Sequence, residues 1–146
     1  MRTFLLGAFQ GMVFALLGLT PVSGQTPEAL AEQFAQAWQN QSQSAVVELL
    51  ASDGITLRLE GDLHGGVGQK RVLAALQSYW EERRVADVVV VNVSTMEGGA
   101  PRAYGELSWN GVNDMTGEAF GATIFLGLQG SDDGWRIDEI RTITPG

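Results

Sequence analysis

The C-terminal part of the chain, from Val85 to Ile143, most constrains the fold, because it holds four strand-like segments separated only by turn signals. In these segments apolar and polar residues alternate or β-branched residues dominate, as is typical of strands. The segments span residues 85–94, 102–110, 118–128 and 135–143. Strands joined by short turns pair antiparallel, so the sequence predicts a four-stranded meander.

Two details predict that this sheet is bent. Ile137 and Ile140 have opposite parity within the last segment, which indicates a β-bulge near Asp138-Glu139. Glycine inside a strand often marks a bend, and the segments contain Gly105, Gly121 and Gly127. We therefore expect a curved sheet with one concave face.

The N-terminal part carries three helical patterns and one more strand. A first helix is expected from Pro27, after Thr26 as N-cap, with an apolar face that runs to Trp38. A short helix follows over residues 44–51, then a half-buried strand over 55–62 and a helix over about 68–84. This order predicts an α+β domain: an antiparallel sheet with three N-terminal helices packed on one face.

Residues 1–24 have the pattern of a secretory signal peptide. Arg2 precedes an apolar run from Thr3 to Leu19, and small residues up to Gly24 follow Pro21. An uncleaved membrane anchor is the alternative, although the run is short for the roughly 20 residues of a membrane span. We expect export to the periplasm or beyond, a soluble chain without membrane association after cleavage, and one domain over residues 25–146.

The net charge argues against a nucleic-acid partner, and the lack of cysteine excludes disulfides. All 17 acidic residues but only 8 of the 9 basic ones follow Gly24, so residues 25–146 carry 8 − 17 = −9. Such a chain repels phosphate backbones, and we expect no nucleic-acid partner. Without cysteine there is no disulfide, so the domain must be held together by its own core.

The stretch from His64 to Arg71 resembles a phosphate-binding loop but lacks the residues that such a loop needs. In a Walker-type loop the lysine follows glycine and precedes a hydroxyl residue, whereas Lys70 stands between Gln69 and Arg71. The dinucleotide pattern fails as well, since Arg71 occupies the place of the third glycine. The glycines are better explained by a tight turn from strand to helix.

Three segments, residues 32–61, 66–80 and 134–143, resemble the nuclear transport factor 2-like superfamily, which includes SnoaL-like and ketosteroid isomerase-like proteins. Within it, the chain is most similar to small secreted bacterial members of unknown function. The resemblance implies a cone-like fold, in which a curved sheet wraps around three helices and leaves an apolar pocket at its open end. It also implies a homodimer formed through the sheet.

The resemblance further implies where catalytic residues would stand. The isomerases use a tyrosine, an aspartate base and a buried aspartic acid, which handle a proton and stabilise an oxyanion. These positions fall on Phe34, on Arg58 or Leu59, and near Ile124. None of these side chains suits its role, so we expect no isomerase activity of that kind, no catalytic residues there and no cofactor.

The remaining polar residues offer few alternatives. His64 is the only histidine and no cysteine occurs, so no metal site is expected. Asp53, Glu60 and Asp62 cluster around the first strand, where turn and surface roles are the simpler explanation. The candidates for polar groups in the pocket are Arg58, His64, Tyr104 and Glu106.

We expect the pocket, as the unfilled end of the core, to be lined by aromatic and apolar residues. The candidates are Phe34, Trp38, Leu76, Tyr79, Trp80, Trp109 and Phe125. The hypothesis is an exported, non-catalytic domain that binds a small apolar ligand or interacts with another protein.

The alternatives are a SnoaL-like cyclase, isomerase or hydrolase with relocated acids, or a structural envelope protein that docks a partner on its sheet. Two ionisable groups converging in one closed cavity would favour the enzyme. An exposed apolar patch on the sheet would favour the docking protein.

Overall fold

The computed structural model describes residues 25–144, without the side chains of residues 62–64. The expected signal peptide, residues 1–24, lies outside the described residues, so its prediction stays untested. Within the described range the helices are α2 (Pro27–Gln39), α3 (Gln43–Val47) and α4 (Gln69–Glu81). The strands are β1 (Ile55–Leu59), β2 (Asp62–Val67), β3 (Arg83–Met96), β4 (Arg102–Asn113), β5 (Ala119–Ser131) and β6 (Gly134–Ile143).

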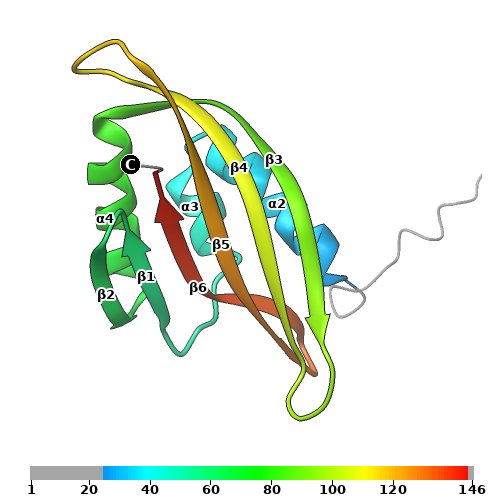
Figure 1. The fold of residues 1–146 in the computed structure, drawn as a ribbon. Coiled ribbons are helices and arrows are strands. Elements are labelled where there is room, and N and C mark those ends of the chain that lie inside the picture. The colour runs from blue at the N-terminus through cyan, green and yellow to red at the C-terminus, as the bar shows by residue number, and fades with distance from the viewer. Residues whose placement is uncertain (1–24, 145–146) are drawn as a thin grey trace, which may run out of the picture.

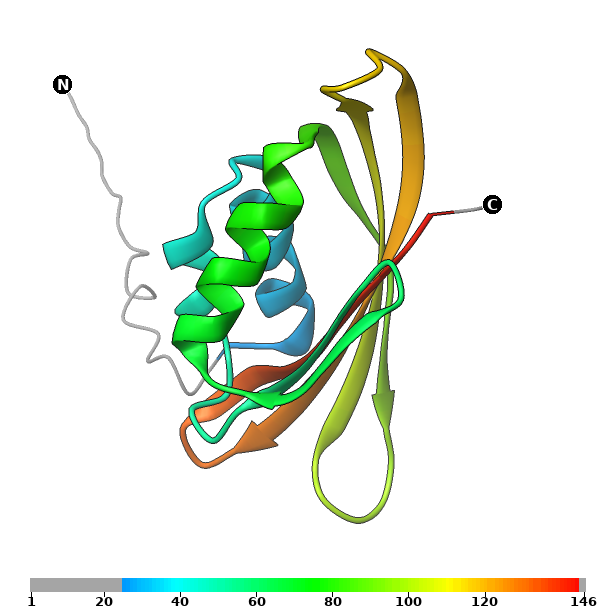
Figure 2. The same ribbon diagram turned by 90° about the vertical axis from the view of Figure 1, so that its left-hand side faces the viewer.

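The strands form one curved sheet in the order β2-β1-β6-β5-β4-β3 (Figure 1). Figure 2 shows that the three helices lie together on the concave side of this sheet. The predicted α+β class, with a curved sheet around three N-terminal helices, is therefore confirmed.

One strand pairing differs from the wholly antiparallel sheet that we expected. β1 runs parallel to β6, with Arg58 opposite Arg141, whereas the other neighbouring strands are antiparallel. The reason is the connection between them: after β1 the chain passes through β2, α4 and the meander before it returns. A connection this long, unlike a hairpin, permits parallel pairing.

A second difference is strand β2, where the sequence predicted only a turn into the helix. Glu60 and Gly61 both have positive φ, 54° and 100°, as in the two-residue turns that join tight β-hairpins. Leu59 therefore lies opposite Asp62, and the hairpin continues to Val67 opposite Ile55. The segment has little strand propensity, and pairing with β1 outweighs that local preference.

Helix α3 is shorter than the predicted 44–51, because the residues after it join the sheet. The Ala51 amide donates to the Ile137 carbonyl at 2.8 Å, and the Ile137 amide donates to the Leu49 carbonyl at 2.9 Å. Helix α2 starts as predicted, with the Thr26 hydroxyl accepting from the Ala29 amide at 3.1 Å. The two backbone hydrogen bonds with Ile137 tie the chain that follows α3 to the start of β6.

The predicted bulge in the last strand is confirmed at Asp138. Gly127 lies opposite Glu139 and Leu128 lies opposite Ile137, so Asp138 is left without a partner on β5. The extra residue lets Ile137 and Ile140 both face the interior, where each is fully buried.

The Asp138 carboxylate makes a bidentate ion pair with Arg102 at 2.8 and 2.9 Å on the convex face. This pair, more than any other contact, raises the pKa of the Arg102 guanidinium.

The core is organised around Trp38, which is fully buried. Its ring lies 5.1 Å from Trp80, 5.4 Å from Phe34 and 5.7 Å from Trp109, measured between centroids. These rings come from α2, α4 and β4, so one side chain joins three elements. Edge-to-face arrangements such as that of Trp38 and Trp80, at 81°, add to the free energy gained by burial.

Gly111 in β4 provides a test of how tightly β3 and β4 pack. A Cβ atom there would lie 2.6 Å from the backbone carbonyl oxygen of Arg84, and 3.1 Å from the rings of Trp109 and Phe120. We expect Gly111→Ala to lower the free energy of unfolding by about 2 kcal/mol or more in urea denaturation. Gly105→Ala on the same strand is the control, because its nearest neighbour is at 3.7 Å. Equal losses in the two variants would contradict the close packing of Gly111 against β3.

Candidate functional site

The aromatic interior is mostly filled. Six of the seven predicted lining residues belong to the hydrophobic core: Phe34, Trp38, Leu76, Tyr79, Trp80 and Trp109. The seventh, Phe125, lies instead on the convex face, opposite Glu106 and Arg141 and 5.0 Å from the Arg141 guanidinium carbon. Its neighbours Ile124 and Leu126 take the inward positions, and successive side chains of a strand point to opposite faces.

A hollow of about 410 Å³ lies at the C-terminal end of α4, between that helix and the turn after β1. Its walls are partly apolar and partly charged, with Tyr79 as the one aromatic residue among them. The lining residues are Leu59, Glu60, Ala75, Ser78, Tyr79, Glu82 and Arg83. We take this hollow as the candidate site, because it combines an aromatic ring, carboxylates and a guanidinium in one concave surface.

Glu60 is held in the hollow by several hydrogen bonds. Its Oε2 accepts from the Tyr79 hydroxyl at 2.8 Å, and its Oε1 accepts from the Thr144 amide at 3.1 Å. Its own amide donates to the Thr142 carbonyl at 3.2 Å. A glutamate with positive φ is uncommon, and these contacts explain how this one is maintained.

Tyr79 is a hydrogen-bond donor in this site. Burial is the main cause that raises the pKa of Tyr79, the Thr142 hydroxyl opposes it, and the Glu60 carboxylate adds to it. The phenol therefore keeps its proton at neutral pH and presents an O–H group to Glu60. Removing the proton would place two negative charges side by side.

Arg83 stacks on Tyr79. Its guanidinium carbon lies 4.2 Å from the centroid of the Tyr79 ring, and its Nη1 donates to the Tyr79 carbonyl at 3.1 Å. This contact caps one of the last carbonyls of α4, a common role for arginine at helix ends. Among the side chains that the structure describes, Arg83 has no ion-pair partner.

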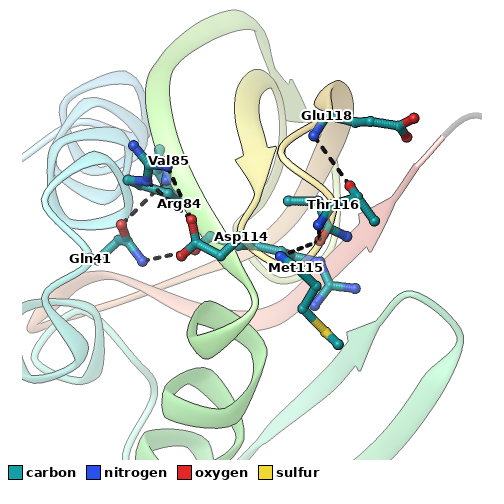
Figure 3. A network of polar contacts seen from close by, with 9 residues as sticks. Gln41, Arg84, Val85, Asp114, Met115, Thr116 and Glu118 are labelled. Atoms are coloured by element: carbon teal, nitrogen blue, oxygen red, sulfur yellow. Dashed lines mark hydrogen bonds and ion pairs between the residues drawn. The ribbon is translucent and has the colours of Figure 1, made fainter.

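The start of β3, which positions Arg83, is held in place by side chains of other elements (Figure 3). Gln41, after α2, donates to the Arg83 carbonyl at 3.2 Å and accepts from the Val85 amide at 3.3 Å. Arg84 pairs with Asp114 in the β4–β5 loop at 3.1 Å. Asn113 closes that loop by accepting from two backbone amides.

The predicted polar candidates do not meet in this hollow. Arg58, Tyr104 and Glu106 share the convex face, because Leu57, Ala103 and Leu107 occupy the inward positions beside them. His64 lies in β2 opposite Leu57, and its side chain is outside the described part. The sequence missed the pairing of Glu60 with Tyr79, because it depends on a turn that brings together residues 19 apart.

Among the side chains that the structure describes within residues 25–144, no group of three or more acidic or histidine residues is arranged to hold a metal ion. None of the helices in that range has the length and apolarity that a membrane span requires.

Comparison of the sequence with protein-family models and with curated proteins finds no match. Solved structures do match. A ketosteroid isomerase-like protein from Erwinia carotovora atroseptica has a TM-score of 0.67 at 20% identity, covering 82% of this chain and 93% of that one. A DUF4783 family protein from Bacteroides ovatus has a TM-score of 0.63 at 14% identity, covering 78% and 94%.

A third match is a hypothetical protein with a ketosteroid isomerase-like fold from Catenulispora acidiphila, solved in complex with trimethylamine. It has a TM-score of 0.60 at 18% identity and covers 81% of this chain and 85% of that one. The chain therefore has the cone-like fold of ketosteroid isomerase-like proteins, as the sequence resemblance implied.

Because the pKa of Tyr79 is raised in the fold, the free energy of unfolding should decrease at alkaline pH. Above about pH 10 the unfolded chain loses the phenol proton and the folded chain keeps it, so the free energy of unfolding falls as pH rises. The slope should approach about 1.4 kcal/mol per pH unit. In urea denaturation at a series of pH values, Tyr79→Phe should remove this decline. Tyr104→Phe, which alters the only other tyrosine, should keep it, and the reverse result would refute the assignment.

Proposed function

We propose that this is an exported, non-catalytic domain that binds a small molecule in the hollow beside Tyr79. The observation that carries the proposal is the arrangement of that hollow: Leu59 and Ala75 form an apolar wall, and charged groups stand at its edge. The ligand would have an apolar body and a polar head. The neighbour solved with trimethylamine supports the idea that this fold accommodates small organic molecules.

The alternative is an enzyme with relocated acids, such as a SnoaL-like cyclase, isomerase or hydrolase. The hydrogen-bonded pair of Glu60 and Tyr79 favours it, because a carboxylate beside an O–H donor is able to move a proton. The open shape of the hollow and the dispersal of Arg58, Tyr104 and Glu106 over the convex face favour binding. A retained ligand that is chemically converted by the wild type, but not by Glu60→Gln, would establish the enzyme.

Native mass spectrometry of protein purified from its own host tests the binding proposal. We expect a small molecule retained by the wild type and lost in Ala75→Trp, whose indole would fill the hollow. Ala74→Trp is the matched control, because Ala74 is exposed on the same helix. A molecule retained equally by all three proteins, or by none, would overturn the proposal.

The convex face supports an additional proposal, a homodimer through the sheet. A row of paired residues crosses this face, in the order Asn92, Glu106, Phe125, Arg141 and Arg58. In this row the acidic Glu106 lies on one side of the central Phe125, and the basic Arg141 and Arg58 lie on the other. A second copy turned by a two-fold axis along β5 would place Glu106 opposite Arg141 and would bring the two Phe125 rings together.

Charge reversal tests this dimer. Glu106→Arg and Arg141→Glu should each weaken dimerisation about tenfold or more, because each places like charges opposite one another. The double variant should restore it, since the complementarity is recreated with opposite sign. Sedimentation equilibrium measures the dissociation constants. A monomeric wild type, or a double variant weaker than both single variants, would contradict the arrangement.

A further inference from the structure

Arg83 shields the aromatic ring of the candidate site. Its guanidinium stacks on Tyr79, whose side chain is otherwise in contact with Trp38 and Trp109 in the core. Tyr79 is only 7% exposed, although Tyr79 and Arg83 both line the hollow. A ligand can therefore reach the face of the ring only if Arg83 moves aside.

The charges around Arg83 make this arrangement unusual. Glu60 and Glu82 line the same hollow, yet within the described residues Arg83 pairs with neither and instead contacts the ring. The Glu60 oxygens accept from Tyr79 and Thr144. If the guanidinium left the ring, the hollow would offer an aromatic face flanked by two carboxylates, which is an environment that attracts organic cations.

We propose, building on the function proposed above, that the ligand is an alkylated ammonium ion and that Arg83 occupies its place on the Tyr79 ring until the ligand displaces it. Alkyl groups would pack on Leu59 and Ala75, and the positive charge would lie over the ring between Glu60 and Glu82. Arg83 is then a built-in competitor that lowers the affinity. Its backbone contact with Tyr79 also holds the ring in position, so it has a structural role as well.

Titration with choline, followed by tryptophan fluorescence, tests this inference. The comparison ligand is its neutral isostere, in which a quaternary carbon replaces the nitrogen. Arg83→Gln should bind choline about threefold or more tightly than the wild type, with little change for the neutral isostere. Arg84→Gln is the matched control, because it removes the same charge from an exposed neighbour that pairs with Asp114. Tyr79→Leu should reduce the preference for choline over the isostere, because the cation–π contact is lost while the two carboxylates remain.

A second variant covers the case in which Arg83→Gln does not fold. Arg83→Lys keeps the charge and loses the planar stacking, so its affinity for choline should lie above that of the wild type. Equal affinity for choline and the isostere, or preferential binding of benzoate, would overturn the cation inference and leave the binding hollow in place. Binding of both ligands unaffected by Ala75→Trp would overturn the proposed function itself.

Discussion

The structure depends on the packing of aromatic rings around Trp38, between the helices and the concave face of the sheet. Trp38 belongs to α2, and its ring contacts Trp80 of α4 and Trp109 of β4. The sequence has no cysteine, and these contacts join α2 and α4 to the sheet within the hydrophobic core. The same packing fills the interior of the cone, so the space left for a ligand lies at its rim.

The two faces of the sheet have different chemistry. The proposed ligand site and the proposed dimer surface therefore lie on opposite faces. The concave face is apolar and buried, and it ends in the hollow beside Tyr79. The convex face carries half-buried charged and aromatic residues in ordered rows, including Glu106, Phe125 and Arg141. A ligand at the rim and a second copy on the convex face would therefore not compete for the same surface.

The sequence predicted the fold well where the signal is local. The alternating segments gave four long strands, and the opposite parity of Ile137 and Ile140 located the bulge at Asp138. The sequence did not predict the strand pairings that depend on residues far apart in the chain. Strand β2 depends on β1, and the parallel contact of β1 with β6 joins residues about 80 apart.

The same limit applied to the site. Strand parity places Tyr104 and Glu106 on one face but does not say which face is concave. The Glu60–Tyr79 contact needs a turn that only the three-dimensional structure reveals.

The hydrogen bonds of Glu60 affect how much the rim of the hollow would have to reorder when a ligand binds. A single carboxylate ties the β1–β2 turn to α4 and to the chain that follows β6. Three separate segments are thereby joined at one side chain, so the hollow is preorganised before a ligand binds. The entropy lost on binding would then be mainly that of the ligand, because the frame around it is already ordered.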